Sequence, residues 1–253
     1  MEEKDFPTPK QVLNIATYLG YCMLRHGAEI SRVEDTADRI CMAYGATEAH
    51  VFAIYSTIIV SVSFGDEMLT QTRRVASIST NLDRVDRLND LSRKICAEKP
   101  DYTSAIKEID AVEARKLYPP KLSIVAYALI SGSFALFFGG NVIDGMVAAL
   151  AGIVVRLVMM MLEYLRVAPF ITTMTASAVV TATSHLAGFL IAGLNVDIII
   201  IGILMNLVPG VAITTSLRDF LSMDYMCGMS RLTEALLTAT AIAIGASVVL
   251  LWQ

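Results

Sequence analysis

The sequence predicts a membrane α-helical bundle of five transmembrane helices preceded by a cytoplasmic α+β domain. Hydrophobic residues make up 55% of the 253-residue chain, yet 17% of the residues are charged. The charges are concentrated at one end, because residues 1–121 hold 16 of the 20 Lys and Arg and 18 of the 24 Asp and Glu. Residues 122–253 contain five largely apolar stretches of about 20 residues, the length that a helix needs to cross a bilayer. We therefore expect a cytoplasmic domain at 1–120 and a transmembrane domain at 121–253.

The first domain is predicted from two different hydrophobic periods. Apolar residues at spacings of three and four indicate helices, while apolar and polar residues alternate strictly around 57–64, as in a half-buried strand. Gly65-Asp66 is a turn signal that returns the chain as a partner strand. Pro119-Pro120 is expected to link the two domains. The predicted elements are helices 9–26, 29–44, 81–95 and 103–117 and strands 50–55, 57–64 and 67–75.

The second domain is oriented by its few basic residues. Short connections make neighbouring helices antiparallel, and five crossings place the two termini on opposite sides of the membrane. Lys and Arg near the helix ends all fall on the side of the first domain, which the positive-inside rule assigns to the cytoplasm. The first residues have neither the basic nor the apolar region of a signal peptide. We expect an inner (plasma) membrane protein with a cytoplasmic N-terminus, an outside C-terminus and helices at 122–138, 142–162, 170–192, 198–216 and 232–252.

The fourth apolar stretch carries polar residues at membrane depth. Pro209 removes a helix hydrogen bond and Gly210 tolerates almost any backbone angle, so the helix is expected to break there. A break inside a bilayer is tolerable only where protein or a wet cavity satisfies the freed backbone groups. Such broken helices line transporter sites, although a Pro-kinked helix with a polar cytoplasmic end is the alternative. The candidate substrate pathway is Asn206, Pro209, Gly210, Thr214, Thr215 and Arg218.

Four other ionisable groups are candidates for proton coupling or gating. A charged or titratable side chain inside a membrane is costly and usually faces a partner or a cavity. Asp144 and His185 are expected to lie within helices, and Asp219 beside Arg218 is a candidate salt-bridged gate; Arg156 completes the set. Glu163 and Arg166, three residues apart, are expected to form an ion pair at the cytoplasmic edge.

A tract of titratable side chains marks the predicted junction of the first two helices. Its candidate residues are Gly27, Glu29, Arg32 and Glu34, and spacing allows Arg25 to meet Glu29. His26 with a carboxylate, or Ser31 as a nucleophile, would be the catalytic interpretation, but no base and orienting group stand at a recognisable spacing. A capping and ion-pair cluster is the simpler interpretation.

The composition indicates no cofactor and no nucleic-acid partner. Cys22, Cys41, Cys96 and Cys227 lack C-x-x-C spacing and companion histidines, so we expect reduced thiols and no metal. No organic cofactor is implied. The net charge is −4, and no basic patch with interleaved aromatic residues occurs, so nucleic-acid binding is not indicated.

Two segments resemble the signatures of the threonine/serine exporter family. The first is Gly27-Ala-Glu-Ile-Ser-Arg-Val-Glu-Asp-Thr-Ala-Asp-Arg-Ile40 and the second is Leu207-Val-Pro-Gly-Val-Ala-Ile-Thr-Thr-Ser-Leu-Arg-Asp219, followed by Gly228 and Glu234-Ala235. They occur in the family's order, and the resemblance covers nearly the whole chain.

The resemblance implies a secondary exporter of a small carboxylate. Complete members of the family are similar to this chain followed by a second membrane half. The chain therefore looks like the longer subunit of the split, two-component form, whose small membrane partner supplies the other half. The split form is associated with succinate and the fused form with threonine and serine, so both substrates stay open. We also expect an oligomer, with the first domain as a regulatory or assembly module. A membrane-anchored enzyme with a catalytic cytoplasmic domain is the alternative.

Overall fold

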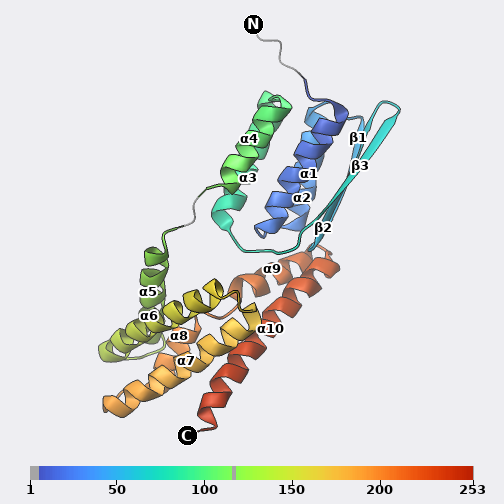
Figure 1. The fold of residues 1–253 in the computed structure, drawn as a ribbon. Helices are drawn as coiled ribbons and strands as arrows, with labels where there is room; N and C mark the ends of the chain where they lie inside the picture. The colour runs from blue at the N-terminus through green and yellow to red at the C-terminus, as the bar shows by residue number, and fades with distance from the viewer. Residues whose placement is uncertain (1–5, 116–117, 253) are drawn as a thin grey trace. The chain divides into compact units, whose positions relative to one another are not determined.

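The computed structural model describes residues 6–115 and 118–252 (Figure 1). By its internal contacts the chain divides into two compact units. The first unit consists of residues up to 116 together with 215–230, and the second consists of 117–214 and 231–253. Residues 1–5 and 253, and the last two residues of the predicted helix 103–117, lie outside the described residues. The cytoplasmic and transmembrane boundary at 120/121 stays a prediction.

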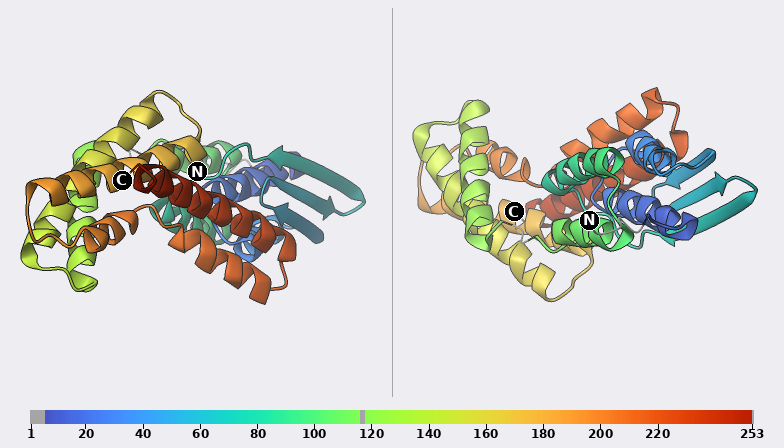
Figure 2. Two further views of the ribbon diagram at one scale, coloured as in Figure 1. Left: turned by 90° about the horizontal axis from the view of Figure 1, so that it is seen from below. Right: turned by 90° about the horizontal axis from the view of Figure 1, so that it is seen from above.

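The first unit is a three-stranded antiparallel sheet covered by two layers of helices. Strand order is β1-β2-β3, and the predicted turn at Gly65-Asp66 joins β2 to β3, with Phe64 opposite Glu67. Helices α1 and α2 pack on the sheet, while α3 and α4 pack on α1 (Figure 2). The elements are α1 (Pro9–Arg25), α2 (Ile30–Ala43), β1 (Glu48–Ile54), β2 (Thr57–Phe64), β3 (Glu67–Arg74), α3 (Leu82–Glu98) and α4 (Tyr102–Glu113).

Local sequence signals account for these elements. Thr8 and Gln11 form a capping box at the start of α1, with the Thr8 N–H donating to Gln11 Oε1 at 2.8 Å. On β2, the side chains of Ile58, Val60 and Val62 are fully buried, as the alternating pattern predicts. They meet α1 closely, because a Cβ at Gly20 would lie 2.6 Å from Ile58 Cδ1.

The core of the first unit includes one residue from far along the chain. Cys227 is fully buried and belongs to the same apolar cluster as residues of α1, α2, the sheet, α3 and α4. This cluster explains why 215–230 group with the N-terminal residues.

The second unit is helical. Its helices are α5 (Pro120–Phe137), α6 (Val142–Tyr164), α7 (Pro169–Leu190), α8 (Val196–Leu204), α9 (Gly210–Leu221) and α10 (Tyr225–Leu250), of which α9 and α10 each have one end in the first unit. Of the helices described, α5, α6 and α10 are long and apolar enough to cross a membrane. The predicted stretch 198–216 is broken in the structure, as Pro209 and Gly210 predict, and the chain there forms α8 and α9 with an interruption between them.

Small residues let the helices of the second unit approach closely. Helix α5 packs against α6 and α8, and α7 packs against α6 and α8. A Cβ at Gly202 of α8 would lie 2.8 Å from the Ala135 backbone nitrogen of α5. A Cβ at Gly245 of α10 would lie 2.1 Å from the Met174 carbonyl oxygen of α7. Backbone contact at these points requires glycine.

Candidate functional site

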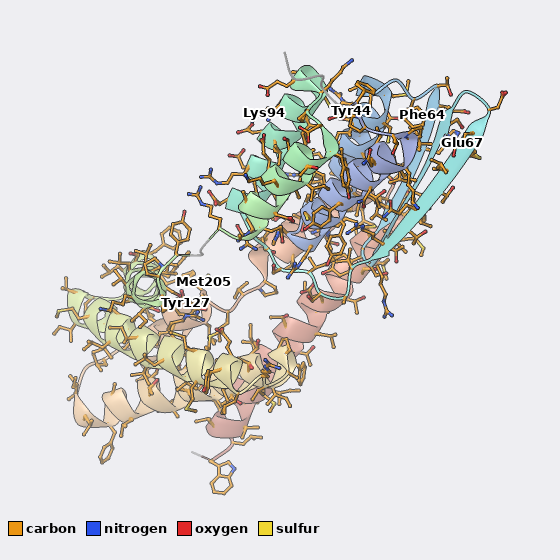
Figure 3. All side chains as sticks on the ribbon, turned by 45° about the horizontal axis from the view of Figure 1, so that its top comes forward. Tyr44, Phe64, Glu67, Lys94, Tyr127 and Met205 are labelled. Carbon is orange, nitrogen blue, oxygen red and sulfur yellow. The ribbon has the colours of Figure 1, made fainter. Side chains whose placement is uncertain are left out.

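The backbone is interrupted where the sequence predicts it. Val208 still donates its N–H to the Leu204 carbonyl at 3.2 Å, but Leu207 bonds only three residues back, to Leu204 at 2.8 Å. Pro209 has no N–H to donate, and a new helix begins at Gly210. Figure 3 labels Met205 at this interruption and Tyr127 on the neighbouring helix α5. The regular i→i−4 ladder therefore stops between α8 and α9.

A polar layer adjoins the interruption. Asn206 donates from Nδ2 to Ser131 Oγ at 2.9 Å and to the Ile203 carbonyl at 3.2 Å. Ser131 of α5 is fully buried, and a Cβ at Gly152 of α6 would lie 2.3 Å from its hydroxyl oxygen. Asn206 Oδ1 is also buried and accepts no hydrogen bond within the described part of the chain. The layer thus contains an open acceptor, meaning a buried oxygen without a hydrogen-bond donor, between three helices.

A second polar layer lies one helical turn, about 5.4 Å, along the same helices. Tyr127 precedes Ser131 by four residues, and Arg156 follows Gly152 by four. The guanidinium carbon of Arg156 lies 5.3 Å from the centre of the Tyr127 ring. Arg156 Nε is buried and donates to no described residue. An open donor and an open acceptor therefore occupy adjacent turns of one helix interface.

The ion pair at the end of α6 differs from the prediction. Arg156 donates to Glu163 Oε1 at 2.9 Å, and the two residues are seven positions, or two turns, apart on one face. Arg166 lies beyond the helix end with a left-handed φ of 55°, which removes it from the spacing that would bring it to Glu163. The expected Glu163–Arg166 pair is therefore wrong.

Asp144 is fully buried and caps two segments. Its carboxylate accepts from the Asn141 N–H at 2.9 Å, the Asn195 N–H at 3.0 Å and Asn195 Nδ2 at 3.0 Å. These bonds join the start of α6 to the start of α8. His185 of α7 differs, because its buried Nε2 makes no hydrogen bond with the described residues.

The remaining pathway candidates do not gather at the polar layers. Thr214 Oγ1 bonds back to the Gly210 and Val211 carbonyls, both at 3.0 Å. Gly210 has no left-handed φ, and a Cβ there would meet nothing within 4 Å, so this conformation does not require glycine. Thr215 and Arg218 belong to the first unit.

In the first unit, Arg218 pairs with Glu29, which precedes α2. Arg32 approaches the same carboxylate at 3.6 Å. The guanidinium of Arg218 therefore contacts a carboxylate of the N-terminal segment, and the gate formed with its neighbour Asp219 stays a prediction. Sequence reasoning missed the pair because no local spacing relates residues 189 positions apart.

The turn between α1 and α2 explains another correction. Gly27 adopts a left-handed φ of 83°, so the helical path of α1 ends before Glu29 and the spacing of four residues no longer brings Arg25 to Glu29. Arg25 consequently pairs with Glu113 of α4 at 3.4 Å and not with Glu29. His26 Nε2 also lies 2.6 Å from Glu113, and burial lowers the pKa of this imidazole below its usual value. This arrangement fits the ion-pair interpretation of the tract.

A cavity of about 270 Å³ lies beside the Glu29–Arg218 pair. Glu34 borders it and accepts from the Ala53 N–H at 2.9 Å. Burial raises the pKa of Glu34, the Ala53 N–H opposes that shift, and the Asp224 carboxylate adds to it. The lining residues come from the start of α2, the end of β1 and the segment 218–226.

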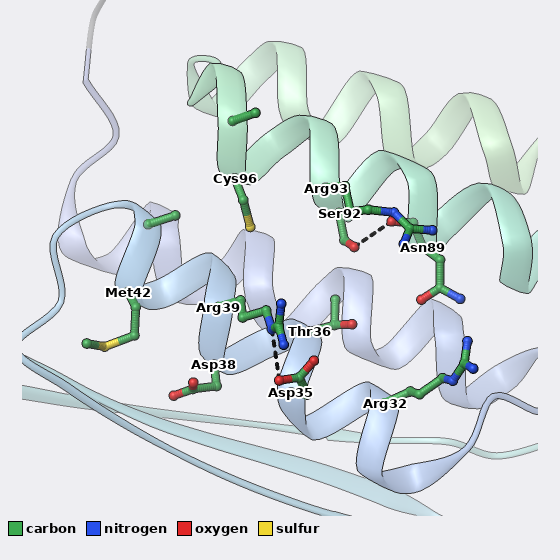
Figure 4. Close-up of a pocket in the computed structure, with 12 residues that line it drawn as sticks. Arg32, Asp35, Thr36, Asp38, Arg39, Met42, Asn89, Ser92, Arg93 and Cys96 are labelled. Carbon is green, nitrogen blue, oxygen red and sulfur yellow. Dashed lines mark hydrogen bonds and ion pairs between the residues drawn. The ribbon is translucent and has the colours of Figure 1, made fainter.

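A larger cavity of about 920 Å³ lies between α2 and α3 (Figure 4). Two of its arginines are already paired on the surface, Arg39 with Asp35 at 2.8 Å and Arg93 with Asp90 at 3.0 Å. In neither unit do the described residues include a group of three His, Cys, Asp or Glu side chains that could hold a metal.

The threonine/serine exporter (ThrE) family model matches residues 14–252. The chain belongs to the threonine/serine exporter family. It is also 24% identical over 239 residues to a protein of Mycobacterium tuberculosis (strain ATCC 25618 / H37Rv) described as "Probable threonine/serine exporter". That match covers 93% of this chain and 45% of the relative, so the chain spans about half the relative's length. No solved structure matches the chain.

Membership of the exporter family decides between the two classes of function. The family is one of exporters and not of enzymes, which favours an exporter over a membrane-anchored enzyme. Three long apolar helices agree with a membrane protein. The two family-like segments meet in the first unit, where Glu29 of the first contacts Arg218 of the second.

Proposed function

We propose that the chain forms the larger part of a secondary exporter that moves a small carboxylate out of the cell through the inner membrane. One observation carries the proposal: the helix interruption adjoins a buried, open acceptor on Asn206 and a buried, open donor on Arg156. Such groups are costly inside a membrane unless a solute or water meets them. A guanidinium matches a carboxylate, and an amide oxygen accepts from a hydroxyl or an ammonium group.

The proposed topology has five crossings. Helices α5, α6 and α10 would each span the membrane, α7 would span it with its hydroxyls turned to neighbouring helices, and α8 with α9 would form an interrupted span. Ser177 of α7 already donates to the Ile242 carbonyl of α10 at 2.7 Å. The basic residues near helix ends support a cytoplasmic N-terminus and an outside C-terminus.

We further propose a partner that supplies a second membrane half. The chain matches 45% of its relative, and many transporters place a substrate site between two structural halves. A small separate membrane subunit would make the exporter a two-component assembly, and the active form would be an oligomer. Outward movement would be coupled to protons, with His185 as the first candidate because its Nε2 is buried and open. The substrate is either a succinate-like dicarboxylate or threonine and serine.

Flux into proteoliposomes tests the function. The chain and its membrane partner would be reconstituted together, and movement of labelled threonine and labelled succinate would be measured under a proton gradient. We expect flux of one substrate that needs both components. Arg156→Gln should lower it at least tenfold, whereas the matched control Arg166→Gln, on an exposed side chain at the end of the same helix, should retain it. Absence of flux of both substrates, or normal flux in Arg156→Gln, would contradict the proposal.

A further inference from the structure

The cavity beside Glu29 is lined by side chains of both charge signs. Its 270 Å³ is suited to a compact solute, and Phe52, Met223 and Met226 provide apolar wall. Its single basic side chain among the lining residues is Arg218, which is 59% exposed and held by Glu29. Four carboxylates line the same cavity: Glu29, Glu34, Asp219 and Asp224.

The cavity is held together by buried contacts of the segment 215–230. Cys227 anchors the segment in the core of the first unit. Ser216 Oγ donates to the Gly228 carbonyl at 2.7 Å, and the Asp224 N–H donates to the Asp219 carbonyl at 2.9 Å. These bonds fix the turn between α9 and α10, so the position of Arg218 depends on the first unit.

We propose that this cavity is a cytoplasmic loading site, in which the carboxylate of a small α-amino acid replaces Glu29 on Arg218. The proposal rests on the exporter function above and selects between its two substrate classes. The ammonium group of the amino acid would face Glu34 and Asp224. Only ion pairs are exchanged: Glu29 leaves Arg218, remains near Arg32 at 3.6 Å, and keeps its charge partly compensated there.

The charges favour an amino acid over a dicarboxylate. When Glu29 is displaced, the ligand's carboxylate takes its place on Arg218 and three further carboxylates remain around the cavity. A second ligand carboxylate would face these like charges, whereas an ammonium group would be attracted to them. A guanidinium fork recognises one carboxylate in two-pronged geometry, and the cavity offers only one such fork among its lining residues.

Displacement of Glu29 by the ligand can be distinguished from an ion pair that only stabilises the fold. If Glu29 competes with the ligand, Glu29→Gln should tighten binding of threonine several-fold, because the competitor loses its charge. A pair that only stabilises the fold would give unchanged or weaker binding. Arg218→Gln should lose at least tenfold in affinity, and Asp35→Asn, an exposed carboxylate elsewhere on α2, should bind as the wild type does.

Equilibrium binding of labelled threonine and labelled succinate to the purified full-length chain in lipid nanodiscs is the experiment. We expect threonine to bind the wild type at least tenfold more tightly than succinate. We also expect Glu29→Gln to bind threonine several-fold more tightly than the wild type does. Should Glu29→Gln fail to show a normal melting transition, Glu29→Asp tests the same competition, because its shorter side chain reaches Arg218 less well.

Three results would overturn the loading site: unchanged or weaker threonine affinity in a folded Glu29 variant, equal affinity for succinate, or normal affinity in Arg218→Gln. Proteoliposome flux separates this failure from failure of the proposed function. Threonine flux with an unchanged KM in the Glu29 variant would reject the loading site and leave the exporter. Loss of flux of every carboxylate in the wild type would reject the exporter itself.

Discussion

Asp144 illustrates how the surroundings of one carboxylate indicate its role. The side chain is fully buried and accepts hydrogen bonds from Asn141 and from both the backbone and side chain of Asn195. A buried acceptor with this many donors stabilises the joined segments, and a change that turns one oxygen into a donor breaks the match. The role in proton coupling stays a prediction, and the contacts point to capping.

Asp144→Asn should lower the free energy of unfolding by about 1–3 kcal/mol. Its new NH₂ group would face N–H donors, whereas Asp197→Asn, at an exposed carboxylate in the first turn of α8, should have little effect. Chemical unfolding in detergent micelles measures both variants. An Asp144→Asn protein of normal stability whose flux has lost its dependence on pH would instead support proton coupling.

Glu34 should make the stability of the first unit depend on pH. Burial raises its pKa above the usual value of about 4.3, so the folded state favours the neutral carboxyl. The associated stability is present below the usual pKa and is lost as the pH rises through the raised value. Glu34→Gln removes the ionisation and can keep an oxygen for the Ala53 N–H.

Melting temperatures between pH 4 and pH 7 test this sign. The difference in stability between Glu34→Gln and the wild type should shift in favour of the variant as the pH rises. Asp35→Asn, one residue away and exposed, should not reproduce that trend. A trend of opposite sign would mean that the Ala53 N–H outweighs burial.

At the scale of elements, glycine sets how closely α5 and α6 approach. Gly152→Ala would place a methyl group 2.3 Å from Ser131 Oγ and 3.1 Å from the Tyr127 carbonyl oxygen. Overpacking of this kind costs about 1–3 kcal/mol, and it should also move Ser131 away from Asn206. Gly210→Ala is the matched control, because a Cβ there meets nothing within 4 Å.

Unfolding in detergent and threonine or succinate flux would be measured for both glycine variants. We expect Gly152→Ala to lose stability and flux together and Gly210→Ala to keep its stability. Equal stability of the two proteins would show that α5 and α6 are not packed as described.

Elements with a clear hydrophobic period were predictable from the sequence. The alternation around Ile58, Val60 and Val62 correctly gave β2, and Pro209 correctly gave the interruption that ends α8. Hydropathy alone placed α8 and α9 in one predicted membrane stretch, because it does not show where the backbone hydrogen bonds of a helix end. The candidate site was only partly predictable: Asn206 was named, whereas Ser131 and Tyr127 were not, since a hydroxyl in an apolar helix resembles ordinary packing.

Contacts between distant segments were beyond the sequence. The spacing rules offered Arg25 for Glu29 and Arg166 for Glu163, but left-handed residues Gly27 and Arg166 break the helical phase in both places. In the structure, Arg25 pairs with Glu113 on another helix, and Glu163 pairs with Arg156, two turns earlier in its own helix. A spacing of three or four residues predicts an ion pair only where both residues belong to the same uninterrupted helix.

At the scale of the whole molecule, thiol reactivity can report whether 215–230 belongs to the first unit. Cys22, Cys41 and Cys227 are buried, and burial raises the pKa of both Cys22 and Cys41 to about 12. Cys96 is only half-buried. Alkylation of the native chain, followed by mass spectrometry, should modify Cys96 first.

The three buried thiols should then become reactive together as denaturant is added, because they share one core. Early modification of Cys227 alone, with Cys22 and Cys41 still protected, would contradict the assignment of this segment. Retained protection of Cys96 in the native state would contradict its partial exposure.

The place of Cys227 in the core bears on how the protein is made. A ribosome releases the N-terminal residues of the first unit long before it releases 215–230, and four helices are synthesised in between. Until the late segment arrives, the nascent unit lacks a piece of its interior. Completion of this unit therefore waits for the synthesis of the four intervening helices, so a chain halted part-way would present an unfinished first unit to chaperones and proteases.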